Sequence, residues 1–194
     1  MSTNLLKTVV IGSDNVGKTA LCNTIVDRTV NKNYNPTIGV DLMVKYIHQY
    51  NETLKLLLWD IAGNERFMGI LDSYVISTPV LIFCYSAECL QSFHEMTRRH
   101  ENYLYNGHTE GKHIIFVVTK IDSNNIKPDY ADWGSEYAKK YKRPFIKTSA
   151  YTKEGIPELI NECLKYLKTP DEQIVKPINL NCKIKDPRIN CCLF

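Results

Sequence analysis

The sequence predicts one α/β domain with a six-stranded, mixed but mostly parallel sheet and helices on both faces. Short apolar, β-branched segments alternate with amphipathic helical segments along residues 5–168. Only two neighbouring strand-like segments are joined by a short turn, and such a hairpin introduces one antiparallel strand. We therefore expect the element order β-α-β-β-α-β-α-β-α-β-α.

Each element is predicted from its own pattern. Leu5–Ile11 is apolar and β-branched, and the helix-compatible stretch Lys18–Asp27 follows it. Leu42–Tyr50 alternates in character and pairs with Leu54–Ile61 across a short turn. The order requires a helix before the fourth strand, whose bounds the pattern does not define. The remaining predicted strands are Val80–Tyr85, Ile114–Val118 and Phe145–Thr148, and the remaining predicted helices are Gln91–Leu104, Trp133–Tyr141 and Ile156–Leu167.

The domain is predicted to span residues 5–168, and a flexible tail, residues 169–194, to follow it, because the apolar periodicity stops there. A net charge of +3 is too small to indicate a nucleic-acid partner, and we expect none. No secretory signal opens the chain, and the longest apolar run, Val80–Tyr85, is far shorter than the ~20 residues of a membrane-spanning helix. The seven cysteines then do not indicate a disulfide framework, and we expect a cytoplasmic monomer.

The segment between the first strand and the first helix matches the phosphate-binding pattern G-x-x-x-x-G-K-[ST]. In this context successive backbone N–H groups face a polyphosphate, and glycines let the chain bend around its oxygens. Lys18 is expected to reach the β- and γ-phosphates, and the Thr19 hydroxyl to bind Mg²⁺. The nucleotide-binding residues predicted here are Gly12, Ser13, Asp14, Asn15, Val16, Gly17, Lys18, Thr19 and Ala20.

A second polar pattern follows the strongly apolar strand that ends near residue 61. Asp60 stands where a Mg²⁺ ligand belongs, accepting hydrogen bonds from metal-bound water opposite the phosphate loop. Gly63 has no side chain, so its N–H can approach a γ-phosphate. Asp-x-x-Gly alone is a weak pattern, but its position downstream of the phosphate loop makes it specific.

These motifs resemble the Ras superfamily of small GTPases. Residues 59–67 resemble switch II of that family, and residues 34–41 resemble switch I. The resemblance implies a P-loop NTPase G domain in which Tyr34 and Thr37 contact the nucleotide, with Thr37 contacting Mg²⁺ and the γ-phosphate only in the triphosphate state. The implied Mg²⁺ ligands are Thr19, Thr37 and Asp60, and the implied catalytic residues are Lys18, Thr37, Gly63 and Asn64.

Two later loops resemble the guanine-binding motifs of the family. Thr119, Lys120 and Asp122 resemble N/T-K-x-D, in which the Asp carboxylate accepts hydrogen bonds from guanine N1 and N2 and the Lys lies along the base. Adenine cannot offer those donors, so GTP and GDP are the expected substrate and product. The loop Ser149, Ala150 and Tyr151 resembles S-A-K, with the Ala150 N–H directed toward guanine O6 and Tyr151 in place of Lys.

Among the branches of the family, residues 38–42 and 55–60 are most similar to Rab proteins. This implies a role in vesicle trafficking, with an exchange factor, an activating protein, effectors and a prenyl-carrying chaperone as partners. The implied effector surface is Leu42, Trp59 and Tyr74, although the residues after Tyr74 depart from the Rab pattern.

The last four residues begin with Cys191 and Cys192 and resemble both the Rab double-cysteine ending and a C-a-a-X motif. One or two geranylgeranyl groups are therefore expected. Basic residues are sparse in the tail, and a stable anchor needs a second signal besides one lipid, which favours two lipids. We expect a peripheral protein on the cytosolic face of a membrane.

Asn64 stands where the family has the glutamine that orients the attacking water. Its side chain is one methylene shorter, and a misplacement of about 1 Å can cost roughly a hundredfold in rate, so we expect slow intrinsic hydrolysis. Val30, Thr119 and Tyr151 also depart from the family pattern and predict weaker nucleotide retention. Two alternatives stay open: a GTP-binding module that barely hydrolyses GTP, and a P-loop kinase or ATPase, which Lys120 and Asp122 disfavour.

Overall fold

The computed structural model describes residues 4–30, 36–49, 52–63 and 68–168. The expected element order is confirmed. The elements are β1 (Asn4–Ile11), α1 (Lys18–Ile25), β2 (Val40–Gln49), β3 (Glu52–Ile61), α2 (Met68–Ser77), β4 (Val80–Ser86), α3 (Leu90–Tyr105), β5 (His113–Thr119), α4 (Pro128–Lys140), β6 (Phe145–Lys147) and α5 (Ile156–Lys168).

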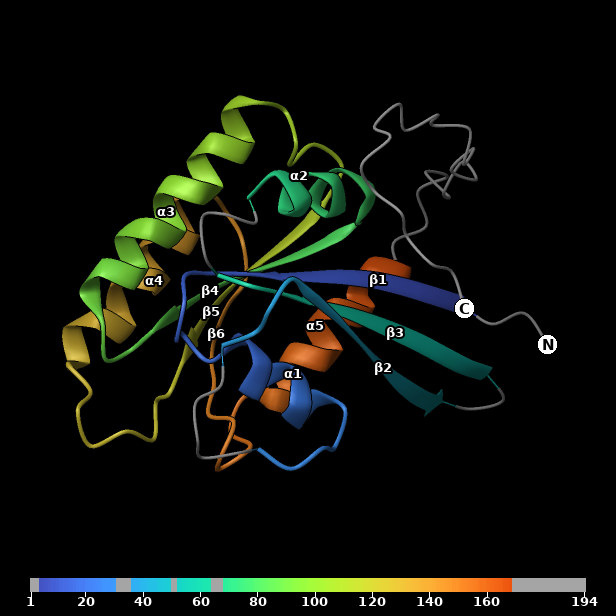
Figure 1. Cartoon of the computed structure of the whole chain (residues 1–194), viewed down its shortest axis with the longest axis horizontal. Helices are drawn as coiled ribbons and strands as arrows, with labels where there is room; N and C mark the ends of the chain where they lie inside the picture. The colour runs from blue at the N-terminus through green and yellow to red at the C-terminus, as the bar shows by residue number, and fades with distance from the viewer. Residues whose placement is uncertain (1–3, 31–35, 50–51, 64–67, 169–194) are drawn as a thin grey trace.

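The six strands form one sheet in the order β2-β3-β1-β4-β5-β6, as the predicted fold class requires. The β2 and β3 strands form the antiparallel hairpin, in which Leu42 lies opposite Trp59. Every other neighbouring pair is parallel. Helices cover both faces of the sheet (Figure 1). The loops that follow β1, β3, β5 and β6 therefore emerge along the carboxyl edge of the sheet, where ligands bind in open α/β folds.

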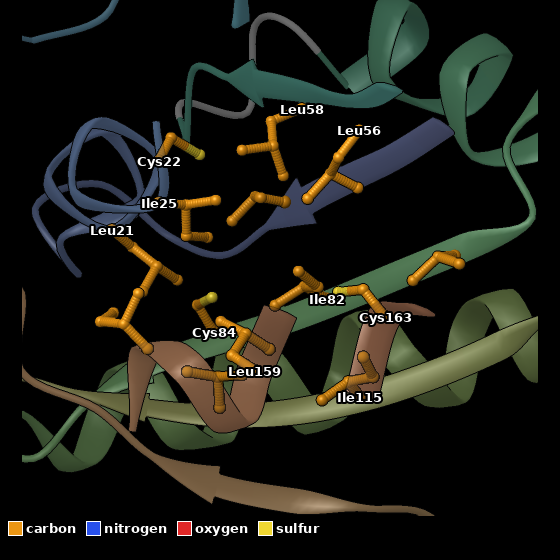
Figure 2. Close-up of a cluster of buried hydrophobic side chains, with 14 of the residues drawn as sticks. Leu21, Cys22, Ile25, Leu56, Leu58, Ile82, Cys84, Ile115, Leu159 and Cys163 are labelled. Atoms are coloured by element: carbon orange, nitrogen blue, oxygen red, sulfur yellow. The ribbon is translucent and has the colours of Figure 1, made fainter. Parts of the chain in front are cut away.

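The strand β4 shows why the sheet is stable at its centre, because all seven of its residues are buried. Ile82 and Cys84 face the side covered by α1 and α5, and Figure 2 shows them among side chains of both helices. Leu81 and Phe83 face the side covered by α2, α3 and α4. Period-two alternation thus places apolar side chains in two cores, one on each face of the sheet.

Two predicted helix bounds differ from the structure by more than one residue. The helix α4 begins at Pro128 rather than Trp133, because a proline fits the first helical position, where its missing N–H has no partner to lose. The helix α1 ends at Ile25 rather than Asp27, and Asp27 itself has a positive φ of 59°. The helix whose bounds the sequence pattern left undefined is α2. No helix in the described part of the chain has the length and apolar character needed to cross a bilayer.

Candidate functional site

The loop between β1 and α1 is held in a conformation that glycine makes possible. Gly17 has a φ of +93°, in the left-handed region that residues with a Cβ rarely adopt. A Cβ on Gly12 would lie 2.6 Å from the carbonyl oxygen of Cys84, so the loop passes directly against β4. Asn15 also has a positive φ, 58°, which asparagine tolerates better than most residues. The backbone therefore bends sharply before α1 begins.

Lys18, the first residue of α1, points back into this loop. Its Nζ donates a hydrogen bond to the Ser13 carbonyl oxygen at 2.8 Å, and the residue is only 6% exposed. Burial removes water from the ammonium group and lowers its pKa, while the Asp60 carboxylate acts in the opposite direction. A buried ammonium beside this sharply bent loop is suited to binding an anion.

Three oxygen-bearing side chains meet beside the loop. The Thr19 hydroxyl lies 2.6 Å from Oδ2 of Asp60 and 2.8 Å from the Thr37 hydroxyl. Asp60 is fully buried, and burial raises its pKa although its hydrogen bond from Thr19 acts against the rise. Its Oδ1 is buried without a hydrogen-bond partner among the described residues. Hydroxyl and carboxylate oxygens are the ligands that Mg²⁺ prefers, so this group fits that ion.

Gly63 brings the segment after β3 against the same loop. A Cβ at this position would collide with the backbone of Ser13 and Asp14. The preceding residue, Ala62, donates its N–H to the Gly39 carbonyl at 2.9 Å. The backbone around Gly63 therefore contacts the phosphate loop on one side and the start of β2 on the other.

The loop after β5 is tied to the phosphate loop by one side chain. The Thr119 hydroxyl donates to the Val16 carbonyl and lies 3.0 Å from the Tyr85 carbonyl. The next residue, Lys120, has a positive φ of 60°, and its Nζ lies 3.0 Å from Oε2 of Glu88. Thr119 thus holds the two loops together with a hydroxyl group where the family pattern most often has an amide.

The loop after β6 is organised by Ser149, which is fully buried. Its Oγ accepts hydrogen bonds from the backbone N–H groups of Tyr151 at 3.2 Å and Thr152 at 3.0 Å. From the other side, the Thr24 hydroxyl lies 3.0 Å from the Ala150 carbonyl oxygen. These contacts fix the backbone that carries the Ala150 N–H.

All four loops line one cavity of about 400 Å³, a volume in the usual range for small-molecule sites. The predicted site residues that line it are Asp14, Asn15, Gly17, Lys18, Thr19, Ala20, Thr37, Gly63, Thr119, Lys120, Asp122, Ala150 and Tyr151. Ser13 and Val16 line a hollow that adjoins it. Three other predicted residues of the described part of the chain lie outside the lining: Gly12, Asp60 and Ser149. Asp60 accepts a hydrogen bond from Thr19, and Ser149 accepts one from Tyr151, and both of these partners line the cavity.

Residues 7–169 match the model of the Ras family. The chain belongs to the Ras family. Curated relatives place it with the Rab-like members. Ras-related protein RabC of Dictyostelium discoideum is 30% identical over 198 residues, covering 97% of each chain. Rab-18 of Caenorhabditis briggsae is 32% identical, covering 86% of this chain and 82% of the relative. Rab-22A of Mus musculus is 27% identical, covering 99% and 100%.

As a Rab-like member of the Ras family, the chain has three residues that the resemblance assigns to effector binding. Leu42 and Trp59 are register partners on β2 and β3, and Leu42 is 41% exposed. The ring centroids of Trp59 and Tyr74 are 4.7 Å apart. The three side chains, which come from two strands and α2, are therefore close together. Tyr34, Asn64, Cys191 and Cys192 lie outside the described residues.

Sequence reasoning missed three residues that the fold brings to this Ras-family site. Glu88 lines the cavity and pairs with Lys120, and its pKa is lowered mainly by a hydrogen bond from Ser123. Thr24 donates a hydrogen bond to the Ala150 carbonyl oxygen, and Arg99, on α3, donates one to the carbonyl oxygen of Gly12 in the phosphate loop. Of the three, only Arg99 could have been identified from the sequence. It lies three residues after Met96 and seven after Ser92, which places a charged side chain on the buried face of an amphipathic helix.

Proposed function

We propose that the chain is a guanine-nucleotide switch that binds GDP and GTP with Mg²⁺ and hydrolyses GTP slowly. One observation carries the proposal: a single cavity is lined by Lys18 and Thr19 of the phosphate loop and by Asp122 and Ala150 of two other loops, which we assign to its two ends. A polyphosphate suits the first end and a purine base the second. The membership of the Ras family supports the same assignment and removes the P-loop kinase alternative.

At the phosphate end, the chain supplies a cation and oxygen ligands. The ammonium of Lys18 binds phosphate oxygens, and its burial strengthens that attraction because water no longer screens it. Thr19, Thr37 and Asp60 are the residues that would hold Mg²⁺, which neutralises phosphate charge when it is bound. Gly63 offers a backbone N–H where a side chain would collide with the loop.

At the base end, Asp122 selects the purine. Its carboxylate accepts hydrogen bonds from guanine N1 and N2, while adenine presents an acceptor at N1 and no amino group at C2. The pairing of Lys120 with Glu88 holds the lysine side chain beside the cavity, where its stem covers the base. The Ala150 N–H faces guanine O6.

Hydrolysis is proposed to be slow because Asn64 replaces the glutamine that orients the attacking water. The same residue motivates a second function, a GTP-binding module that recruits partners and barely turns over. An activating protein that supplies its own glutamine and arginine would restore hydrolysis in either case. Which function holds depends on the intrinsic rate.

The cellular role we propose is vesicle or membrane trafficking on the cytosolic face of a membrane. The effector surface of Leu42, Trp59 and Tyr74 presents partly exposed apolar side chains from both switch-bearing segments, which suits a partner that reads the nucleotide state. Geranylgeranyl groups on Cys191 and Cys192 would supply the anchor. Mass spectrometry of the protein from eukaryotic cells tests this: a C-terminal peptide without added lipid would refute the anchor.

The decisive test of nucleotide choice is calorimetry on nucleotide-free full-length protein with Mg²⁺, titrated in turn with GDP, GTP, ADP and ATP. We expect uptake of both guanine nucleotides and no detectable uptake of the adenine forms. Boiling the purified protein and identifying the released nucleotide by chromatography provides an independent reading. Equal uptake of ADP and GDP, or no uptake of GDP, would refute the proposal.

A further inference from the structure

Arg99 is a buried cation next to the phosphate loop. It lies on α3, is 5% exposed, and shares the buried face of that helix with Met96 and Tyr103. Arginine is rarely buried unless its charge is paired, because removing the guanidinium from water is costly. Its burial here therefore calls for specific contacts that offset the cost.

The guanidinium of Arg99 makes those contacts with two backbone carbonyls. Its Nη2 donates to the Gly63 carbonyl oxygen at 2.9 Å, and its Nη1 donates to the Gly12 carbonyl oxygen at 3.4 Å. Its Nε is buried without a partner, and no carboxylate of the described residues forms an ion pair with it. The planar fork of arginine is suited to holding two carbonyls in fixed relative positions.

Gly63 is the point at which three segments meet. Its backbone contacts Ser13 and Asp14 of the phosphate loop, and its neighbour Ala62 bonds to Gly39, two residues after Thr37. Arg99 brings in the third segment, α3, through its hydrogen bond to the Gly63 carbonyl. A glycine has unusual backbone freedom, so an outside hydrogen bond is needed to hold its peptide groups in one orientation.

We propose that Arg99 is a positioning residue for the triphosphate state, which holds the Gly63 backbone against the phosphate loop by bridging the carbonyls of Gly12 and Gly63. This rests on the proposed guanine-nucleotide function. The N–H of Gly63 is the group assigned to the γ-phosphate, which GDP lacks. Holding this segment in place before binding reduces the ordering cost of GTP binding and leaves GDP binding almost unchanged.

The test compares dissociation constants for GDP and the non-hydrolysable analogue guanosine 5′-(β,γ-imido)triphosphate, using full-length protein with Mg²⁺. Arg99→Gln removes the charge and the fork. We expect the analogue to bind about tenfold more weakly, the usual size of a lost hydrogen bond from a charged donor, and GDP affinity to change by less than about twofold. Arg98→Gln is the matched control, because Arg98 is the exposed neighbour on the same helix, and it should leave the ratio unchanged.

Arg99→Lys provides a second variant that keeps the charge and most of the side-chain volume but lacks the planar fork that fixes the relative positions of the two carbonyls. It should shift the ratio in the same direction by about threefold, and it carries the test alone if Arg99→Gln does not fold. An unchanged ratio, or an equal loss for both nucleotides with a lower Tm, overturns the proposal, since a purely structural arginine gives one of those results. Failure of the proposed function would appear instead in the unsubstituted protein, which would then bind neither nucleotide.

Discussion

The hydroxyl group of Thr24 lies 3.0 Å from the carbonyl oxygen of Ala150, so α1 holds the loop that follows β6. The two residues are 126 positions apart in the chain. The same hydroxyl lies 2.9 Å from the Ala20 carbonyl within the helix, and Thr24 is buried. A helix that begins at the phosphate loop is thereby connected to the backbone assigned to the purine base.

We predict that Thr24→Val weakens GDP binding by about threefold to tenfold, because the Ala150 carbonyl loses a buried hydrogen-bond partner and its loop shifts. IDP should lose the same factor, since hypoxanthine shares O6 with guanine and differs only at the 2-amino group. Displacement of a fluorescent nucleotide measures both constants. Thr97→Val, which removes a hydroxyl that bonds within α3, serves as control. A loss confined to GDP would contradict the assignment of Thr24 to the O6 side.

For Asn64→Gln we predict a rise in the intrinsic hydrolysis rate of up to roughly a hundredfold, since the longer side chain brings the amide to the distance at which it orients water. Single-turnover assays with GTP-loaded protein measure the rate directly. GDP affinity should stay the same, because the change lies at the γ-phosphate end. Equal hydrolysis rates for the two proteins would refute the explanation from side-chain length.

The sheet was predictable from local pattern for a physical reason. Val80–Ser86 and His113–Thr119 are buried by helices on both faces, so nearly every residue must be apolar, and such runs are visible in the sequence. The start of α4 was not predictable in this way. Its first turn begins with proline and carries Asp129, and the exposed Asp132 follows. This part of the helix therefore lacks the apolar stripe on which the helical prediction depended.

The same distinction applies to the site. The phosphate loop and the loop after β5 are contiguous motifs, so sequence spacing predicted which of their residues share a cavity. Thr24, Glu88 and Arg99 contact residues that are distant in the sequence, through contacts that exist only after the sheet has formed. Thr24 lies 126 positions from its partner and Glu88 lies 32 from its own. The two partners of Arg99 are 87 and 36 positions away. Their residue types are ordinary for helices and loops, so no local pattern identifies their partners.

Gly134 of α4 packs where no side chain fits. A Cβ there would collide with the Tyr85 hydroxyl, and it would also lie 2.5 Å from Cε2 of Phe145 and 2.8 Å from Cε1 of Tyr85. In an ordinary helix interior, Gly→Ala stabilises by about 1 kcal/mol. We predict the opposite sign for Gly134→Ala, a loss of about 1–3 kcal/mol, because the added methyl group displaces a packed aromatic ring.

Urea unfolding followed by circular dichroism measures this change. Gly69→Ala in α2 is the matched control, since a Cβ there meets nothing within 4 Å and the backbone is not left-handed. We expect the control to leave the free energy of unfolding unchanged or slightly higher. If both variants gain stability, the close packing of α4 against Tyr85 is wrong.

His100 is a buried histidine on α3 that the fold keeps neutral. It is 1% exposed, its Nδ1 lies 2.9 Å from the Tyr137 hydroxyl, and the rings of Phe83 and Phe116 meet it edge to face. Burial lowers its pKa from 6.5 to about 4; nearby Glu101 acts in the opposite direction. The unfolded chain therefore binds one more proton than the folded protein between these two pH values.

Because the unfolded state holds that extra proton, the free energy of unfolding should fall as the pH decreases from 6.5 toward 4, by about 2–3 kcal/mol from this residue. Well above pH 6.5 both states are neutral at His100, and its contribution is constant. His100→Phe keeps a ring among the aromatic neighbours and removes the titrating group. Across this pH interval, the free energy of unfolding of the variant should therefore fall less steeply with decreasing pH, by the slope that corresponds to about one bound proton. Urea titrations at half-unit pH steps measure both slopes. Identical slopes for the original protein and His100→Phe would show that His100 does not remain neutral in the fold.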